Sequence, residues 1–368
     1  MRRRLTVLLA EDVRAFGRAR SDARLLPYRL DHLRDLGWDV VSADPASAAA
    51  GSTRLVRSLG RLVSRLGPPA TPTLSVLARL VRGSAVLTVF ESEGHFLALL
   101  RALLPPLRRR GRMVVVVCWL AELLPGMSPR RRALMRFAYR GVDAVACFSP
   151  NQVDVLHQWL QLPRERLHAI PFGIDTDEFP DSQAESPYLL AVGRDRGRDW
   201  STTFAAVHDA GLPLKVLCRP ADLVGVVVPP EVEVLGYVPR ERYRELLQSA
   251  SAVLLLTQDL AYPTGQTVLL EAMSSGRPCV VTTTAAMAGY LDASAVCAVP
   301  VGDVHAAQAA VRRLVVDADL RRRLGRAAAA TARSRHGAEL MCQELDRLLE
   351  LPNAPVVATT TSRSPSCT

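Results

Sequence analysis

The sequence predicts an α/β protein of two domains, each a parallel sheet covered by helices on both faces. Three observations lead to this class. The 368 residues exceed the length at which a single hydrophobic core usually keeps growing. The composition, 49% hydrophobic and 22% charged, fills two cores and excludes a disordered chain. Short, continuously apolar runs alternate with amphipathic segments, as in a Rossmann-like sheet.

The C-terminal half shows this alternation most clearly. Its strand-type runs are YLLAV (188–192), PLKVL (213–217), VEVLGY (232–237), AVLLL (252–256) and PCVVT (278–282). Its helix-type segments are DWSTTFAAVHDAG (199–211), RERYRELLQSA (240–250), GQTVLLEAMSSG (265–276) and an Arg/Ala-rich stretch at about 304–335. We therefore expect a Rossmann-like domain at 186–335, a C-terminal helix at 336–350 and a flexible tail at 351–368.

The N-terminal half, 1–175, shows the same pattern less regularly. Its strand-type runs are LTVLLA (5–10), WDVVSA (38–43), AVLTVF (85–90), MVVVVCW (113–119) and DAVACF (143–148). Helices are expected at 53–66, 73–82 and 152–160. The segment 170–187, rich in Pro, Gly and acidic residues, is expected to be the hinge between the two domains.

The chain lacks the marks of a secreted, membrane-spanning or zinc-binding protein. The apolar part of its N-terminus, 5–10, is too short for a signal peptide and is followed at once by two acids. The longest other apolar run, 113–121, is far too short to span a bilayer. Seven cysteines without a CxxC pair provide neither a disulfide framework nor a zinc site, which favours a cytoplasmic location.

Four segments, taken in this order and spacing, resemble glycosyltransferase family 4. They are SPNQVDVLHQWLQLPRERLHAIPFGIDTDEF (149–179), AVGRDRGRDW (191–200), LGYVPRERYRELLQSASAVLLLT (235–257) and GQTVLLEAMSSGRPCVVT (265–282). The resemblance implies the GT-B fold, in which two Rossmann-like domains face each other across a cleft. It also implies a retaining, hexosyltransferase-like enzyme that binds a nucleotide-diphosphate sugar in its C-terminal domain and an acceptor in its N-terminal domain.

The turn after the first C-terminal strand is suited to a diphosphate. Gly193 permits a tight turn, and Arg194 and Arg198 follow, where arginine can bond phosphate oxygens bidentately. By the resemblance, Arg194 matches the phosphate-binding arginine of the family and Arg198 the nearby basic residue. A solvated charged turn is the alternative, and Arg196 competes with Arg198 for the second role.

The last segment offers a helix N-terminus, a second phosphate-binding feature. Its residues are Thr264, Gly265, Gln266 and Thr267. Thr264 could equally act as a plain N-cap. The resemblance makes Glu271 the acceptor for the ribose hydroxyls, against a solvated stripe as the alternative, and adds Tyr237 and Val238 to the donor-binding set.

One departure from the family lies in this same loop. The family commonly has a glutamate that contacts the donor sugar eight positions before Glu271, and this chain has Pro263 there. Gln266 could supply hydrogen bonds in its place. A non-catalytic GT-B protein serving as a partner or scaffold is therefore the main alternative, while an epimerase or phosphorylase is a rival within the fold.

Neither a metal nor a cofactor is expected. Asp175 and Asp177 have the spacing of an acidic metal-binding motif, but they lie in the interdomain segment and are interpreted as turn residues. In GT-B enzymes basic residues and a helix dipole stabilise the leaving group instead. The nucleotide-diphosphate sugar is a co-substrate.

Candidate catalytic residues come from strand ends of the N-terminal half. The family often has a histidine there, but the matching strand ends in Cys118 and Trp119. His95 and Glu122 are therefore the candidates, with Glu91 and Glu93 at similar positions. A lone histidine is also commonly structural.

The charge is concentrated in the first half, where residues 1–180 carry 27 arginines and 16 acids. Four arginines recur at intervals of three and four on the 53–66 helix: Arg54, Arg57, Arg61 and Arg65. This face could be solvated, could steer an anionic acceptor, or could contact the inner membrane surface as a peripheral helix. The acceptor class stays open between a small molecule, a lipid and a glycan. Nucleic acid is disfavoured because aromatic residues do not interleave with the arginines.

Overall fold

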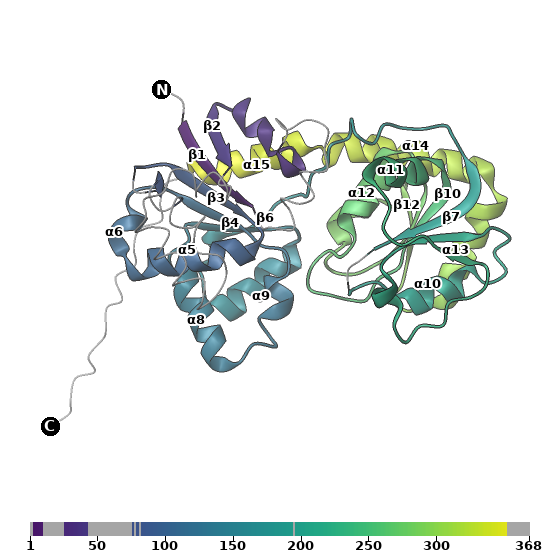
Figure 1. The fold of residues 1–368 in the computed structure, drawn as a ribbon, viewed down its shortest axis with the longest axis horizontal. Coiled ribbons are helices and arrows are strands. Elements are labelled where there is room, and N and C mark those ends of the chain that lie inside the picture. Colours follow the sequence, from purple (N-terminus) through teal and green to yellow (C-terminus); the bar gives the residue numbers. More distant parts are fainter. Residues whose placement is uncertain are drawn as a thin grey trace.

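The structure is a computed structural model that describes residues 3–9, 26–42, 76, 79–80, 82–193 and 196–351, without the side chains of Ser92 and Glu93. Two α/β halves lie side by side, the first in purple to blue and the second in green (Figure 1). Each half is built on one six-stranded sheet whose strand pairs are all parallel. The two sheets confirm the predicted pair of Rossmann-like halves.

The N-terminal sheet has the strand order β2-β1-β3-β4-β5-β6. Its strands are β1 (Arg3–Leu9), β2 (Trp38–Ser42), β3 (Ala85–Val89), β4 (Met113–Val116), β5 (Ala144–Cys147) and β6 (Leu167–Ala169). The helices of this half are η1 (Pro27–Arg34), α5 (Glu91–Leu103), α6 (Pro105–Arg108), α7 (Leu120–Leu123), α8 (Pro129–Tyr139), α9 (Pro150–Leu160) and η2 (Arg164–Arg166).

The C-terminal sheet has the strand order β12-β11-β10-β7-β8-β9. Its strands are β7 (Ser186–Val192), β8 (Leu214–Leu217), β9 (Val232–Val234), β10 (Ala250–Leu255), β11 (Cys279–Thr282) and β12 (Val296–Val299). The helices that follow are α10 (Trp200–Val207), η3 (Pro220–Leu223), α11 (Arg240–Ser249), α12 (Gln266–Ser274), η4 (Ala288–Tyr290), α13 (Val304–Val316), α14 (Ala318–Arg335) and α15 (Ala338–Glu350).

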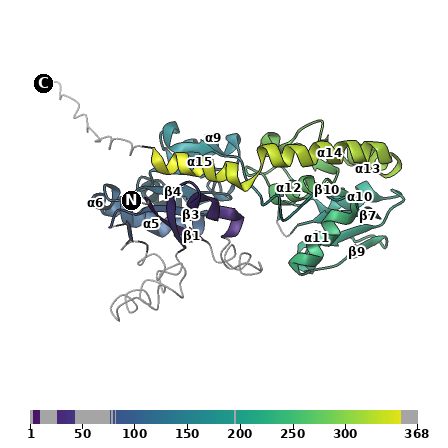
Figure 2. The ribbon, with the colours of Figure 1, turned by 90° about the horizontal axis from the view of Figure 1, so that it is seen from above.

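The last helix returns to the first half. Figure 2 shows α14 over the C-terminal half and α15 continuing nearly in line with it over the N-terminal half. The apolar face of α15 is buried there: Met341, Cys342, Leu345, Leu348 and Leu349. Asp346 on the same helix accepts a hydrogen bond of 2.7 Å from the indole N–H of Trp38 in β2. The chain therefore crosses between the halves twice.

The two crossings are paired with each other. The backbone N–H of Ile174 donates to the His336 carbonyl, and the N–H of Ala338 donates to the Ile174 carbonyl, both at 2.9 Å. One hydrophobic cluster runs through this junction and covers one face of both sheets, whereas the opposite faces have separate clusters. Because the core is continuous at the junction, the crossings form a packed connection.

The sequence-based prediction differs from the structure in a few elements. The stretch at 304–335 is two helices, because Asp317 ends α13 and caps α14 by accepting from the Leu320 N–H at 2.8 Å. The edge strands β6 and β12 were not predicted, since three or four half-buried residues give little apolar signal. The expected helix at 53–66 lies outside the described residues. In the 73–82 helix, residues 76, 79 and 80 are helical.

Candidate functional site

The loop after β7 is shaped by one buried arginine. The Nε of Arg198 donates to the Val192 carbonyl at 2.9 Å, and the side chain is only 8% exposed. A Cβ on Gly193 would lie 2.0 Å from that Nε, and a Cβ on Gly265 would lie 2.3 Å from a terminal nitrogen of the same guanidinium. Arg198 therefore fills the space between two glycines, and a larger residue at either position would displace it. Arg194 lies outside the described residues.

The positively polarised end of α12 meets this arginine. Gly265 is the N-cap of the helix with a φ of 85°, a left-handed conformation that favours glycine. In the described part of the chain, the backbone N–H groups of Thr267 and Val268 have no acceptor. The Oε1 of Gln266 is buried and likewise without a hydrogen-bond partner among those residues. Two free N–H groups, the helix dipole and a guanidinium together favour an anion here.

Thr264 does not cap the helix. It is 2% exposed and packs beside Gly197, where an added Cβ would lie 2.9 Å from its hydroxyl oxygen. Its role in the structure is to hold the loop before α12 against the loop after β7. The two candidate phosphate-binding segments are thereby brought together.

Glu271 lies one turn further along α12 and is buried. Its carboxylate accepts a hydrogen bond of 2.5 Å from the Tyr243 hydroxyl and one of 3.2 Å from a terminal nitrogen of Arg240. Arg240 also forms a bidentate pair with Glu178, at 2.8 and 3.0 Å. The interpretation of Glu271 as part of a solvated stripe is wrong, because its side chain is only 5% exposed.

Burial and charge act against each other in this cluster. Burial raises the pKa of Glu271 above its ordinary value, although the charge of Arg240 and the hydrogen bond from Tyr243 oppose this shift. For Arg240, burial lowers the pKa, but the bond to Glu178 and the charge of Glu271 more than compensate and raise it overall. Arg240 is therefore a permanent cation, and it favours the ionised form of the glutamate it contacts.

Tyr237 and Val238 lie on the loop between β9 and α11, just before Arg240. Tyr237 is 77% exposed. Val238 is partly buried and packs against the core. The same short stretch thus links an exposed aromatic ring to the buried Glu271 cluster.

The N-terminal half forms hydrogen bonds with the loop that leads to α12. Glu122, on α7, accepts a hydrogen bond of 2.8 Å from the Ala261 N–H. Asn151, on α9, donates one of 3.0 Å to the Ala261 carbonyl. Ala261 also packs against the apolar cluster of the N-terminal half. The backbone N–H and the carbonyl of Ala261 are therefore both hydrogen-bonded from across the interface.

His95 has its contacts within the N-terminal half. Its Nδ1 lies 3.2 Å from the hydroxyl of Tyr139, and the two rings pack edge to face. Burial, followed by the charge of Arg131, lowers the pKa of His95 to about 4. His95 is therefore neutral at neutral pH and suited to hydrogen bonding without a charge.

Glu91 holds the loop in which the family histidine was expected. Its carboxylate accepts from the Cys118 N–H at 3.0 Å and from the Trp119 N–H at 2.7 Å. Burial raises the pKa of Glu91, and these backbone bonds oppose the shift. The side chain of Glu93 lies outside the described part.

Within the acidic pair of the interdomain segment, Asp175 pairs with Arg29 at 3.0 Å. Among the described residues, no group of three His, Cys, Asp or Glu side chains is arranged to hold a metal ion. Within the same residues, none of the helices combines the length and apolar character needed to cross a bilayer.

Sequence reasoning missed three residues of this region: Asn151, Arg240 and Tyr243. All three lie inside the segments that carry the family resemblance, but their partners are 110, 31 and 28 residues away in the sequence. The only sequence signal that could have pointed to these three residues is that they lie within those segments.

Residues 29–178 match the family model "Glycosyltransferase Family 4", and residues 210–317 match "Glycosyl transferases group 1". Together the two matches cover well over half of the chain. No curated protein matches the sequence.

Solved structures share the fold at low identity. A sucrose-phosphate synthase from Thermosynechococcus elongatus aligns with a TM-score of 0.66 and 17% identity over 94% of this chain and 98% of its own. HepE of Anabaena in complex with UDP aligns with a TM-score of 0.64 and 13% identity, over 94% and 99%. TarM aligns with a TM-score of 0.55 and 12% identity, over 77% and 58%. These matches confirm the predicted GT-B arrangement.

Proposed function

We propose that this chain, which belongs to the group 1 and family 4 glycosyltransferases, transfers a sugar from a nucleotide-diphosphate sugar to an acceptor. Transfer proceeds with retention and without a metal ion. The observation that carries the proposal is the position of Arg198 between Gly193 and Gly265, at the start of α12.

The diphosphate is assigned to this arginine and the helix N-terminus. The Thr267 and Val268 N–H groups supply donors, and the guanidinium supplies charge close to them. Arg194, by the family resemblance, adds a second cation. Gly193 and Gly265 leave the room that the Arg198 side chain needs to reach this position. The leaving nucleotide is stabilised by these groups in place of a metal.

The nucleoside is assigned to Glu271 and the loop of Tyr237 and Val238. An ionised carboxylate has about four lone-pair sites, and Arg240 and Tyr243 occupy two of them. Ribose hydroxyls would therefore share Glu271 with its protein partners. Because HepE of Anabaena was solved with UDP, uracil is the first base to test.

The sugar itself is assigned to Gln266. Its buried Oε1 lacks a partner in the described chain, so a sugar hydroxyl would satisfy it. Pro263 occupies the position of the glutamate that commonly makes this contact in the family, and this keeps the non-catalytic partner as a second candidate. Turnover of a nucleotide sugar separates the two.

The acceptor is assigned to the N-terminal half, where His95 would contact it as a neutral hydrogen-bonding group. Glu122 is placed in the closure of the interface, because its carboxylate is engaged by the Ala261 N–H. A small molecule, a lipid or a glycan all remain acceptors to be tried.

The deciding experiment is a thermal-shift screen of nucleoside diphosphates and nucleotide sugars. At least one is expected to stabilise the wild type. Arg198→Gln should then weaken its binding by about 1.5–3 kcal/mol, the value of a charge-assisted bond. Arg242→Gln, an exposed change on α11 that removes the same charge, is the control and should have no effect. Failure of every nucleotide to bind, or equal losses in both variants, would exclude this donor site.

A further inference from the structure

A second polar cavity lies at the opposite edge of the C-terminal sheet. It has a volume of about 230 Å³ and is lined by Ser251 at the start of β10 and Pro278 just before β11. In a parallel sheet all strands begin at the same edge, so this cavity is separated by the full strand length from Gly193 and the start of α12. It is not part of the proposed donor site.

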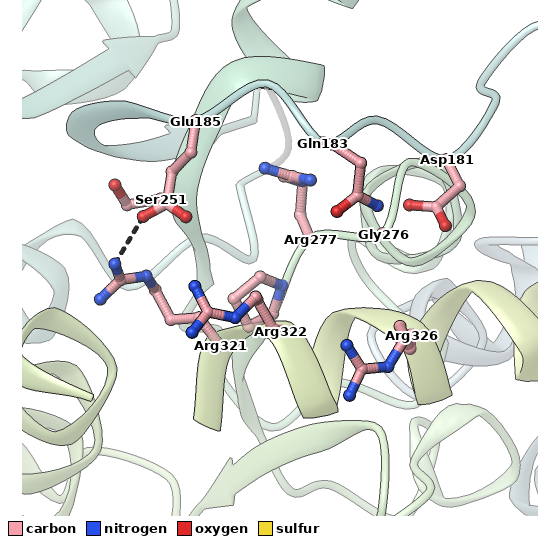
Figure 3. Close-up of a pocket in the computed structure, with 10 residues that line it drawn as sticks. Asp181, Gln183, Glu185, Ser251, Gly276, Arg277, Arg321, Arg322 and Arg326 are labelled. Atoms are coloured by element: carbon pink, nitrogen blue, oxygen red, sulfur yellow. Dashed lines mark ion pairs between the residues drawn. The ribbon is translucent and has the colours of Figure 1, made fainter. Parts of the chain in front are cut away.

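Two walls of different chemistry face each other across the cavity. Figure 3 shows Arg321, Arg322 and Arg326 rising from α14 on one side. On the other side, Asp181, Gln183 and Glu185 descend from the segment that links the two halves. Arg277 extends between the walls from the turn after α12 (Figure 3).

Arg277 is a buried cation whose charge is not matched by an ion pair. It is 7% exposed and donates to the carbonyls of Ser275, Ala184, Ala250 and Ser182. In the described chain no carboxylate lies within 4 Å of its guanidinium. Carbonyl dipoles satisfy its N–H groups, and the negative charges that act on it, those of Glu185 and Asp181, lie beyond ion-pair distance.

Arg321 and Arg326 add donors that the described residues do not use. Arg321 pairs with Glu185 at 2.6 Å, but its Nε is buried without an acceptor. Arg326 has neither an ion pair nor a side-chain hydrogen bond among those residues, and Arg322 has only an exposed pair with Asp319. The unmatched groups on this wall are therefore cations and N–H donors, which favour the binding of an anion.

We propose that this cavity binds a sugar phosphate, with the phosphate against Arg322, Arg326 and Arg277 and the hydroxyl groups against Asp181 and Gln183. Arginine is suited to phosphate because its planar fork bonds two oxygens at once. Carboxylate and amide oxygens accept from sugar hydroxyls. At about 30 Å³ per water molecule, the volume corresponds to roughly eight waters, more than a lone phosphate fills.

The position of the cavity gives such a ligand a structural consequence. Asp181 and Gln183 belong to one crossing between the halves, and α14 leads into the other. A bound sugar phosphate would tie the first crossing to α14 within the C-terminal half. The site is an effector site, independent of the proposed transfer chemistry.

The test is calorimetric titration of the full-length protein with glucose 6-phosphate, inorganic phosphate and glucose. UDP is added at saturation to fill the donor site; if UDP does not bind, the titrations are run without it, so failure of the donor assignment leaves this test intact. The expected order is glucose 6-phosphate tighter than phosphate, with no binding of glucose. The double change Arg322→Gln and Arg326→Gln should weaken glucose 6-phosphate binding by about tenfold or more.

Two controls separate the site from general charge. Arg323→Gln with Arg333→Gln removes the same charge from exposed positions of α14 outside the cavity and should leave binding unchanged. Asp181→Asn should reduce the preference for glucose 6-phosphate over phosphate, because it weakens a hydroxyl acceptor while removing a negative charge. Equal losses in the two double variants, equal binding of phosphate and glucose 6-phosphate, or no binding at all would overturn the proposal.

Discussion

The carboxylate of Glu122 accepts a hydrogen bond of 2.8 Å from the backbone N–H of Ala261, 139 residues away and in the other half of the molecule. Together with the bond from Asn151 to the carbonyl of the same residue, it attaches the N-terminal half to the loop that precedes α12. We therefore expect closure of the interface and the shape of the candidate donor site to be coupled through this contact.

Loss of this contact should open the interface. Glu122→Ala removes a charge-assisted bond of about 1.5–3 kcal/mol, which changes the ratio of closed to open molecules by about 10- to 100-fold. Small-angle scattering of the nucleotide-saturated protein should show a larger radius of gyration. Glu122→Gln keeps an acceptor oxygen and should restore the wild-type value. An identical radius for Glu122→Ala and the wild type would contradict the coupling.

Glu271 is expected to support stability as well as ligand binding. Glu271→Gln breaks its ion pair with buried Arg240 and should lower the free energy of unfolding by about 1.5–3 kcal/mol. Urea denaturation measures the change. The matched control is Glu245→Gln. It breaks an exposed pair between Glu245 and Arg242, both on α11, and should cost less than about 1 kcal/mol. Equal costs would show that burial of the Glu271 cluster is unimportant.

His95 should make the protein sensitive to acid. The pKa of His95 is about 4 in the folded protein, against an ordinary value of 6.5. Between pH 4 and pH 6.5 the unfolded chain therefore binds more protons than the folded protein. Stability due to neutral His95 is therefore present above pH 6.5 and lost as the pH falls to 4, by at most about 3 kcal/mol. His95→Asn should reduce the loss of stability between pH 7 and pH 4.5, measured by denaturation curves at both pH values. His208→Asn, at a side chain 69% exposed, is the control and should leave it unchanged.

Turnover should not depend on a divalent metal. Arg198 and the start of α12 supply the positive charge that a metal would otherwise bring to the diphosphate. Activity measured as nucleotide release should survive exhaustive chelation and should not rise when magnesium or manganese is added. Loss of turnover in chelator with recovery on adding metal would refute the assignment.

The basic face predicted for 53–66 can be tested on membranes. If it is a peripheral contact, the protein should sediment with anionic liposomes at low salt, since each arginine near the surface contributes about 1 kcal/mol. High salt and the joint replacement of Arg54, Arg57, Arg61 and Arg65 by glutamine should both abolish sedimentation. Binding that is unaffected by the four substitutions would rule out this face.

The sequence predicts the sheets well because their strands are short apolar runs that stand out from charged surroundings. It misses β6 and β12, whose exposed edges weaken that signal. For the candidate site it identifies the segments but not their pairing. Glu271 can be singled out as a carboxylate in an apolar helix, yet its partner Arg240 is one of many arginines, and only the packing of α11 against α12 selects it.

The return of α15 to the first half bears on how the protein is made. The sheet that begins at residue 3 is completed by apolar side chains of residues 341–349, so the first half to leave the ribosome is the last to finish folding. Until the helix emerges, the surface under Met341, Leu345 and Leu348 is uncovered and exposed to other nascent chains. Truncation before residue 338 would leave this surface uncovered permanently. An isolated N-terminal half is therefore expected to aggregate on expression.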